Sequence, residues 1–221
     1  MEGQQKAIAM ALIDIQRSEE YILGVWRVEE DEETLKQIVG GDYFPGLAKI
    51  SHPRRRLEWL AARSLLRKFG YTGHVMYHPT RRPFLAHSRA HISISHSYPY
   101  VAVVMSDNHL VGVDIESFTR PFNEVTHKYL SSNEKRWVDV EDNRTLSLIW
   151  SAKEAIYKLP GMEGIGGHEM DVKPIERLDR NGKLNATVRI GGMVQRFELN
   201  YFYMDYFNVV WVCSNPKVLV W

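Results

Sequence analysis

The segment Val111–Glu116, VGVDIE, places two carboxylates two residues apart near the middle of the chain. Side chains alternate along a β-strand, so Asp114 and Glu116 would point to the same side, roughly 7 Å apart. Two acids on one face repel each other unless a positive charge lies between them. Mg²⁺ takes oxygen ligands of this kind and keeps phosphate oxygens in its other positions. The pair indicates either a magnesium site or a strand end that points two acids at solvent.

A second segment, WSAKEAIYK, has helical spacing and places Trp150, Glu154 and Lys158 on one face. Glu154 would serve there as a third metal ligand or as a base, and Lys158 would contact a phosphate one turn away. The alternative is an exposed Glu–Lys pair, which stabilises a helix only slightly. Apolar residues near the same side favour a partly buried face, where an acid needs a partner or a metal.

The third segment, HISISHS, alternates like a strand and ends in a turn. Hydroxyl groups, backbone amides and an imidazole at a turn can hold a phosphate, which makes Ser95 and His96 candidates. A serine hydrolase is disfavoured, because adjacent serine and histidine side chains point apart on a strand and no nucleophile elbow is present. The remaining alternative is a hairpin with polar ends.

Basic residues gather at two further places, Arg54–Arg56 with Arg63 behind them, and Arg81–Arg82 before Pro83. Arg54–Arg56 open a predicted helix, where positive charge opposes the helix dipole. We therefore expect them to meet an acidic surface, with a solvated helix start as the alternative.

These segments need a scaffold, and the chain predicts an α+β fold. Helical patterns cover residues 32–39, 53–69 and 146–159. Strand patterns cover the ranges 7–15, 20–28, 91–96, 99–106, 109–117, 169–178, 183–202 and 207–214. A polar helical region is expected from about 122 to 139. We expect two pseudo-symmetric lobes, residues 1–112 and 113–221, each a long helix packed on a small, three-stranded antiparallel sheet, with the site between them.

Composition excludes several classes of protein. The formal net charge is +1, which argues against a nucleic-acid-binding protein, since these usually carry a strong basic excess. The single cysteine, Cys213, permits neither an internal disulfide nor a cysteine metal site. No apolar run reaches the roughly 18 residues of a membrane span. We expect a cytoplasmic protein with no nucleic acid or membrane partner.

Taken together, VGVDIES and WSAKEAIYK resemble the two signature segments of the 4′-phosphopantetheinyl transferase family, at the spacing of its larger, two-lobed, surfactin-synthetase-activating type. ISISHS and the ARSLLR of the long helix resemble two further segments of that type. The resemblance implies a holo-[acyl-carrier-protein] synthase type of transferase. Such an enzyme moves phosphopantetheine from coenzyme A to a serine of an apo acyl or peptidyl carrier protein, depends on Mg²⁺ and releases 3′,5′-ADP. It further implies a monomer, because one chain completes the pocket.

The resemblance also implies roles for the residues of the two signature segments. Asp114, Glu116 and Glu154 match the magnesium ligands. Glu154 is in addition the candidate base on the carrier's serine. Lys158 matches the lysine that contacts the phosphate and protonates the leaving group, and Lys153 matches a lysine near the nucleotide phosphates.

For the first half of the chain, the resemblance implies ligands of coenzyme A. Ser95 and His96 match residues that hold its phosphates, and Arg63 resembles a ligand in the first lobe. Arg82 replaces the lysine of a G-K-P segment, and Arg81 stands where that segment has glycine, which leaves the shape of the loop open. A module that binds coenzyme A or a carrier protein without catalysis is the alternative function.

Overall fold

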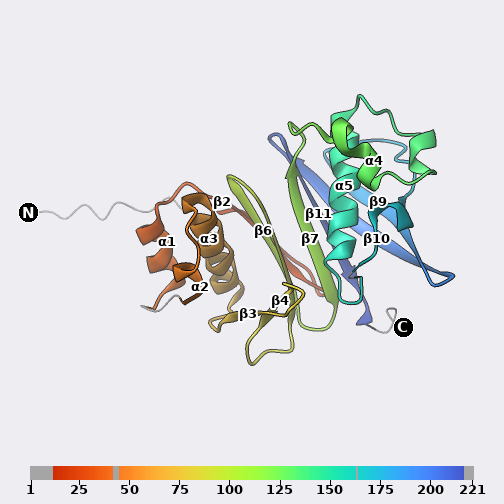
Figure 1. Ribbon diagram of the computed structural model, residues 1–221. Coiled ribbons are helices and arrows are strands. Elements are labelled where there is room, and N and C mark those ends of the chain that lie inside the picture. The colour runs from red at the N-terminus through yellow and green to blue at the C-terminus, as the bar shows by residue number, and fades with distance from the viewer. Residues whose placement is uncertain (1–11, 42–44, 163, 217–221) are drawn as a thin grey trace, which may run out of the picture.

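The structure is a computed structural model that describes residues 12–41, 45–162 and 164–216. The chain forms four layers, in the order helix, sheet, sheet, helix (Figure 1). The long helices α3 (Pro53–Phe69) and α5 (Asn143–Tyr157) form the outer layers. The α+β class and its two similar halves are confirmed.

The first sheet has the order β1–β2–β6–β5 and is antiparallel throughout. Its strands are β1 (Leu12–Arg17), β2 (Ile22–Arg27), β5 (His91–Ser97) and β6 (Tyr100–Ser106). A separate hairpin joins β3 (Val75–Tyr77) to β4 (Pro83–Leu85), and α1 (Glu32–Val39) and α2 (Pro45–Ala48) lie beside α3. The first half of the predicted strand 7–15 lies outside the described residues.

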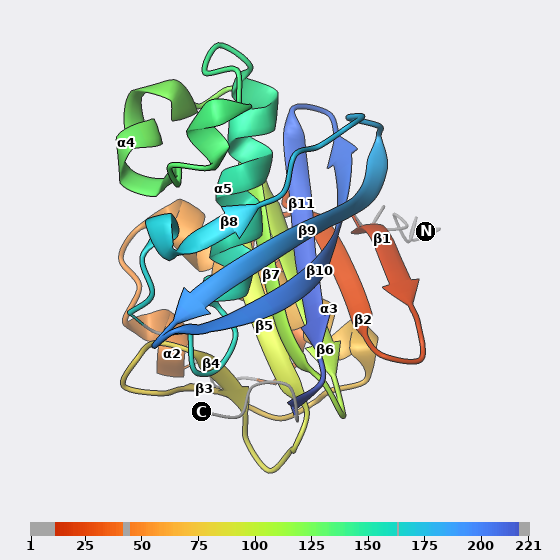
Figure 2. The ribbon, with the colours of Figure 1, turned by 90° about the vertical axis from the view of Figure 1, so that its right-hand side faces the viewer.

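The second sheet has the order β7–β11–β10–β9–β8 and is also antiparallel. Its strands are β7 (Leu110–Ser117), β8 (Met170–Val172), β9 (Asn181–Ile190), β10 (Met193–Met204) and β11 (Phe207–Ser214). Figure 2 shows α5 lying across this sheet, with the short helix α4 (Thr126–Tyr129) at one end. Three single turns complete the half: η1 (Phe122–Val125), η2 (Glu134–Arg136) and η3 (Gly167–Glu169).

Local sequence explains where the two long helices begin and end. Pro53 occupies the first turn of α3, and Gly70 ends it in the left-handed conformation with φ 97°. The carboxylate of Asp142 caps α5 by accepting hydrogen bonds from the backbone N–H groups of Arg144 and Thr145. Pro160 follows α5 closely and cannot continue it.

Three apolar layers hold the four structural layers together. One lies between α3 and the first sheet, and a second lies between α5 and the second sheet. The third joins the two sheets face to face and includes Leu23, Val104, Val113, Ile115 and Val209. Because both faces of each sheet are covered, the joint between the halves is fixed by buried apolar contacts.

The expected three-stranded meander in each half is wrong in two respects. β7 was assigned to the first sheet, but it pairs with β11, and its apolar residues pack against the face of the first sheet. The chain therefore passes from the first sheet to the second between β6 and β7. The expected boundary between the lobes, at 112/113, falls inside β7. The expected strand 169–178 forms only β8, since Pro174 has no N–H to offer to the ladder.

The predicted polar helical region 122–139 is divided into three short helical segments, η1, α4 and η2. Its side chains cap turns: the N–H of Ser131 donates to Glu134, and Ser131 Oγ accepts from the Glu134 N–H. Short polar side chains that bond to nearby backbone in this way compete with a regular helix.

Candidate active site

The candidate site lies where β5 of the first sheet runs beside β7 of the second. Hydroxyl groups of β5 join the two strands. Ser93 Oγ accepts from the N–H of Val113 at 3.1 Å, and Ser95 Oγ donates to Asp114 Oδ1 at 2.8 Å. The alternation predicted for HISISHS is confirmed, because Ser95 faces β7 while Ile92 and Ile94 pack toward α3. Residues from both halves thus meet at one place.

Gly112 lets α5 lie unusually close to β7. A Cβ atom at this position would come within 1.9 Å of the carbonyl oxygen of Ala155. Any other residue would therefore push α5 away from the strand. The glycine of VGVDIE has a packing reason, and its effect is to bring Glu154 and Lys158 close to Asp114.

Asp114 is buried, and a lysine from α5 neutralises it. Lys158 Nζ lies 2.8 Å from Asp114 Oδ1 and also donates to Ser95 Oγ and to the carbonyl of Val113, each at 2.9 Å. The other carboxylate oxygen, Oδ2, is buried and has no hydrogen-bond partner among the described residues. An orphaned buried carboxylate oxygen is costly in free energy, and it offers a ligand position to a cation.

Glu116 and Glu154 stand near the same carboxylate. Burial raises the pKa of Glu154, and the charges of Asp114 and Glu116 raise it further, while Lys158 lowers it. Burial likewise raises the pKa of Glu116, whose two oxygens each accept from Arg120 Nη1 at 2.6 Å. The three acids therefore influence one another's protonation, as expected for carboxylates that share a site.

The three acids could together bind a divalent cation only if their oxygens converge. Among the described residues, no three histidine, cysteine or acidic side chains converge closely enough to coordinate one. Lys158 contacts Asp114 Oδ1, and Arg120 contacts Glu116. The donor set nevertheless fits a hard cation: all three groups offer oxygen, and Asp114 Oδ2 is orphaned. Binding there would require the two cationic side chains to move.

Lys153 does not belong to this site, although the sequence placed it near the nucleotide phosphates. Its Nζ lies in the core of the second half, 2.5 Å from Glu134 Oε2, and donates to the carbonyls of Tyr129 and Gly167. All three N–H donors are thus used within the protein. Burial lowers the pKa of Lys153, and Glu134 opposes that shift. We do not retain Lys153 as a ligand.

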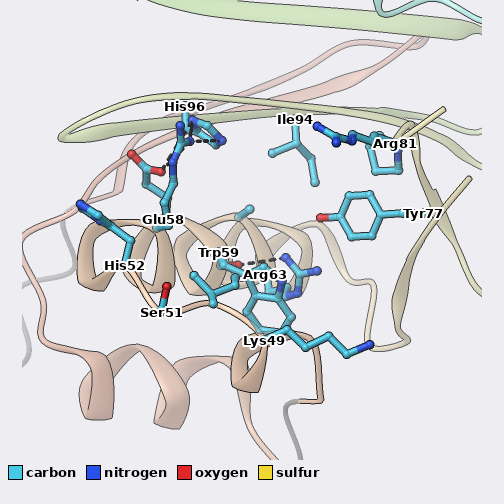
Figure 3. A pocket seen from close by; sticks show the side chains of 14 residues that line it. Lys49, Ser51, His52, Glu58, Trp59, Arg63, Tyr77, Arg81, Ile94 and His96 are labelled. Atoms are coloured by element: carbon cyan, nitrogen blue, oxygen red, sulfur yellow. Dashed lines mark hydrogen bonds and ion pairs between the residues drawn. The ribbon is translucent and has the colours of Figure 1, made fainter. Parts of the chain in front are cut away.

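On the other side of β5, a cavity of about 570 Å³ lies between α3, β5 and the β3–β4 hairpin (Figure 3). Basic side chains dominate its charged lining: Lys49, His52, Arg55, Arg63, Arg81 and His96. Glu58 is the one carboxylate among the lining residues. Cations gathered in this proportion repel one another and favour an anionic ligand. We call this space the basic cavity.

Glu58 contacts two basic side chains, Arg55 and His96, at one end of the basic cavity. Its Oε2 lies 3.1 Å from Arg55 Nη1 and 3.6 Å from His96 Nδ1, and Glu58 itself is buried. Burial lowers the pKa of His96; Glu58 opposes the shift, and Arg55 and Lys158 add to it. The sequence indicated His96 but missed Glu58. Its spacing was a usable signal, because Glu58 lies three residues after Arg55 on a predicted helix, where the two side chains can pair.

Arg63, predicted to be a ligand of coenzyme A, also lines the basic cavity. Its guanidinium stacks on the Trp59 ring at 3.3 Å from the ring centre, and Nη1 donates to the Trp59 carbonyl at 3.0 Å. Burial lowers the pKa of Arg63, and Tyr77 opposes that shift. A fixed guanidinium beside two aromatic rings suits a phosphate with an attached planar base.

Arg82 and Arg81 lie in different places. Arg82, the predicted coenzyme A ligand, lines a separate cavity of about 280 Å³ that also includes Arg89, His91 and Lys158. Arg81 lines the basic cavity. The structure thus brings Arg81, and not Arg82, to the same cavity as His96 and Arg63.

The three arginines at the start of α3 have three different environments. Arg56 binds Glu32 through two contacts of 2.6 Å and donates to the carbonyls of Leu47 and Ile50. Arg55 faces the basic cavity. Arg54 lies over the ring of Tyr98 at 5.0 Å, on the exposed surface. The three arginines therefore do not form one shared surface for an acidic partner. Arg54 is the one that we retain as a candidate for such a contact.

The second half of the chain is similar to a known protein family. Residues 110–195 match the model of the 4′-phosphopantetheinyl transferase superfamily. The match confirms the predicted resemblance at the level of the superfamily and includes the segments VGVDIES and WSAKEAIYK, whereas Ser95, His96 and Arg63 precede it. No curated protein matches the chain. None of the helices among the described residues is long and apolar enough to cross a membrane.

Proposed function

We propose that this protein transfers 4′-phosphopantetheine from coenzyme A to a serine hydroxyl of an apo acyl or peptidyl carrier protein and releases 3′,5′-ADP. We assign it to the two-lobed type of the family. One observation carries the proposal. Consecutive residues of β5 face two different binding regions: Ser95 faces the buried acids and Lys158, and His96 faces the basic cavity.

Coenzyme A has the chemistry that these two regions call for. It carries a pyrophosphate, where bonds are exchanged, and a separate phosphate on the ribose next to a planar adenine. We place the pyrophosphate near Ser95 and Lys158, because their donors lie beside the acids. We place the ribose phosphate and adenine in the basic cavity, beside the Arg63–Trp59 stack.

The transfer exchanges one phosphorus–oxygen bond for another. The carrier's serine oxygen bonds to the β-phosphorus, while the bond from that phosphorus to the bridging oxygen breaks and its electron pair leaves with 3′,5′-ADP. Glu154 accepts the serine proton, and Lys158 donates hydrogen bonds to the phosphate oxygens. Reactions of this kind depend on positioning and charge neutralisation more than on covalent participation by the protein.

A divalent cation, Mg²⁺ by the family resemblance, would be held by Asp114, Glu116 and Glu154. When bound, it would neutralise charge on the pyrophosphate oxygens. The support for these ligands is their shared face, their mutual effect on pKa and the orphaned Oδ2 of Asp114. Lys158 would then turn from Asp114 toward the phosphate.

The test is to incubate the purified protein with coenzyme A, Mg²⁺ and a panel of apo acyl and peptidyl carrier proteins, and to weigh the carriers intact by mass spectrometry. We expect a gain of one phosphopantetheine that disappears with EDTA and returns when Mg²⁺ is added in excess. A carrier whose serine is replaced by alanine is the control. Transfer that survives EDTA would remove the metal from the proposal.

The second candidate is a non-catalytic module that binds coenzyme A or a carrier. The mutual repulsion of Asp114, Glu116 and Glu154 disfavours it, because a pure binding site gains nothing from acids that oppose a polyanion. Binding of coenzyme A without release of 3′,5′-ADP on every carrier would favour the module over the enzyme.

A further inference from the structure

The loop between β3 and β4 contains an arginine in a backbone conformation that suits glycine. Arg81 has φ 67°, in the left-handed region. Two backbone hydrogen bonds close the turn around it: the N–H of Arg81 donates to the carbonyl of His78 at 2.8 Å, and the N–H of His78 donates to the carbonyl of Arg82 at 2.9 Å. Left-handed backbone costs free energy for a residue with a Cβ atom. The fold does not require an arginine side chain for these bonds.

The arginine side chain instead faces the basic cavity. Figure 3 shows Arg81 and Tyr77 at the end of the cavity opposite His96 and Glu58. Within the part of the chain that the structure describes, the guanidinium of Arg81 makes no hydrogen bond or ion pair. Arg55, in contrast, is paired with Glu58. A strained backbone that places an uncompensated cation at a cavity marks a functional position.

We propose that Arg81 is a binding and specificity residue for the ribose 3′-phosphate of coenzyme A. The inference rests on the proposed function, which places the pyrophosphate at Ser95 and Lys158 and leaves the 3′-phosphate for the basic cavity. Arg63 is already engaged with Trp59, and His96 with Arg55 and Glu58. Arg81 therefore supplies the positive charge for the phosphate that Arg63 and His96, already in contact with other groups, do not supply. The left-handed turn directs the Arg81 side chain into the basic cavity.

Substitution of Arg81 by glycine should affect ligand binding and protein stability in opposite directions. Glycine at position 81 relieves the backbone strain and removes the guanidinium. Arg81→Gly should raise or preserve the melting temperature while it weakens binding of 3′,5′-ADP about ten-fold or more, as expected for hydrogen bonds to a charged group. Arg81→Asn serves as a second variant, since asparagine tolerates left-handed backbone but carries no charge.

The experiment measures binding of 3′,5′-ADP and of 5′-AMP, which lacks only the 3′-phosphate, by calorimetry to the wild-type protein and to Arg81→Gly, Arg81→Asn and Arg89→Ala. We expect the two Arg81 variants to lose the preference for 3′,5′-ADP, with binding of 5′-AMP unaffected. Arg89→Ala, in the separate cavity, should retain the preference. An unchanged preference in both Arg81 variants would overturn the inference, and so would equal weakening for both nucleotides.

Failure of the proposed function gives a different result. A wild-type protein that binds neither nucleotide and loads no carrier would remove the function and the inference together. A wild-type protein that loads carriers, with an Arg81→Gly variant of the same KM for coenzyme A, would remove only the role of Arg81.

Discussion

Lys153 and Lys158 lie close together at the end of α5, yet their surroundings differ. Lys153 is closed within the second half, where Glu134 and two carbonyls use all its donors. Lys158 is one quarter exposed and contacts Asp114, whose second oxygen is buried without a partner. Both bind a carboxylate from another part of the chain. In the Lys153–Glu134 pair every lysine donor is used within the protein, whereas the Lys158–Asp114 pair leaves one carboxylate oxygen without a partner among the described residues.

The difference shows how to separate structural charge from functional charge. The Glu134 carboxylate also accepts from the N–H groups of Ser131 and Val172, so the Lys153 pair ties α5 to η2 and β8. A buried pair with this many hydrogen bonds contributes to the fold only while both partners remain. The Asp114 group has three acids against two cations, Lys158 and Arg120, an imbalance that a further cation would relieve.

The largest expected effect is on turnover. Glu154→Gln removes the proposed base and keeps the shape of the side chain. We expect carrier loading to fall by about 10²–10⁴-fold, the usual contribution of a positioned acid or base. The melting temperature should not fall, because the variant removes a buried charge that has acidic neighbours. Loading rates from mass spectrometry and thermal unfolding measure the two effects. Near-normal turnover would take Glu154 out of the mechanism.

The next prediction concerns the buried ion pair of Lys153 and Glu134. Lys153→Met leaves Glu134 buried without its cation, and we expect the free energy of unfolding to fall by about 3–5 kcal/mol. Urea unfolding measures this loss. The double variant Glu134→Gln, Lys153→Met should recover part of it.

Turnover per folded molecule should stay near the wild-type value in Lys153→Met, whereas Lys158→Met should lose turnover with a smaller loss of stability. If Lys153→Met instead weakened coenzyme A binding and left unfolding unchanged, the comparison of the two lysines would be wrong.

The smallest effects concern the arginines of α3. Arg56→Ala breaks the contacts to Glu32, whose pKa Arg56 and, to a smaller extent, Lys36 lower to about 2, and should reduce the melting temperature by a few degrees. Arg54→Ala should leave stability unchanged and raise the KM for an acidic carrier several-fold, with a weaker salt dependence of association. Steady-state kinetics across a salt series measure the KM for the carrier, and thermal unfolding measures the stability of each variant. Identical salt profiles for Arg54→Ala and the wild-type protein would dismiss carrier docking by Arg54.

The sequence by itself determined the chemistry of the second half. Alternation places Asp114 and Glu116 on one face of a strand, and helical spacing brings Glu154 and Lys158 to the same side of α5. Those are local periodicities, fixed by backbone geometry within a few residues. Local signals also predicted the helices at 32–39 and 53–69, because capping residues and proline or glycine mark their ends.

Only the tertiary structure decided which residues meet across the chain. Strand pairing depends on long-range packing, so the sequence could not show that β7 leaves the first sheet and lies beside β5. Whether a lysine enters the core or the site depends on its position around the helix, and here that separates Lys153 from Lys158. The same holds for Arg81, since a left-handed turn, invisible in residue types alone, directs its side chain into the basic cavity.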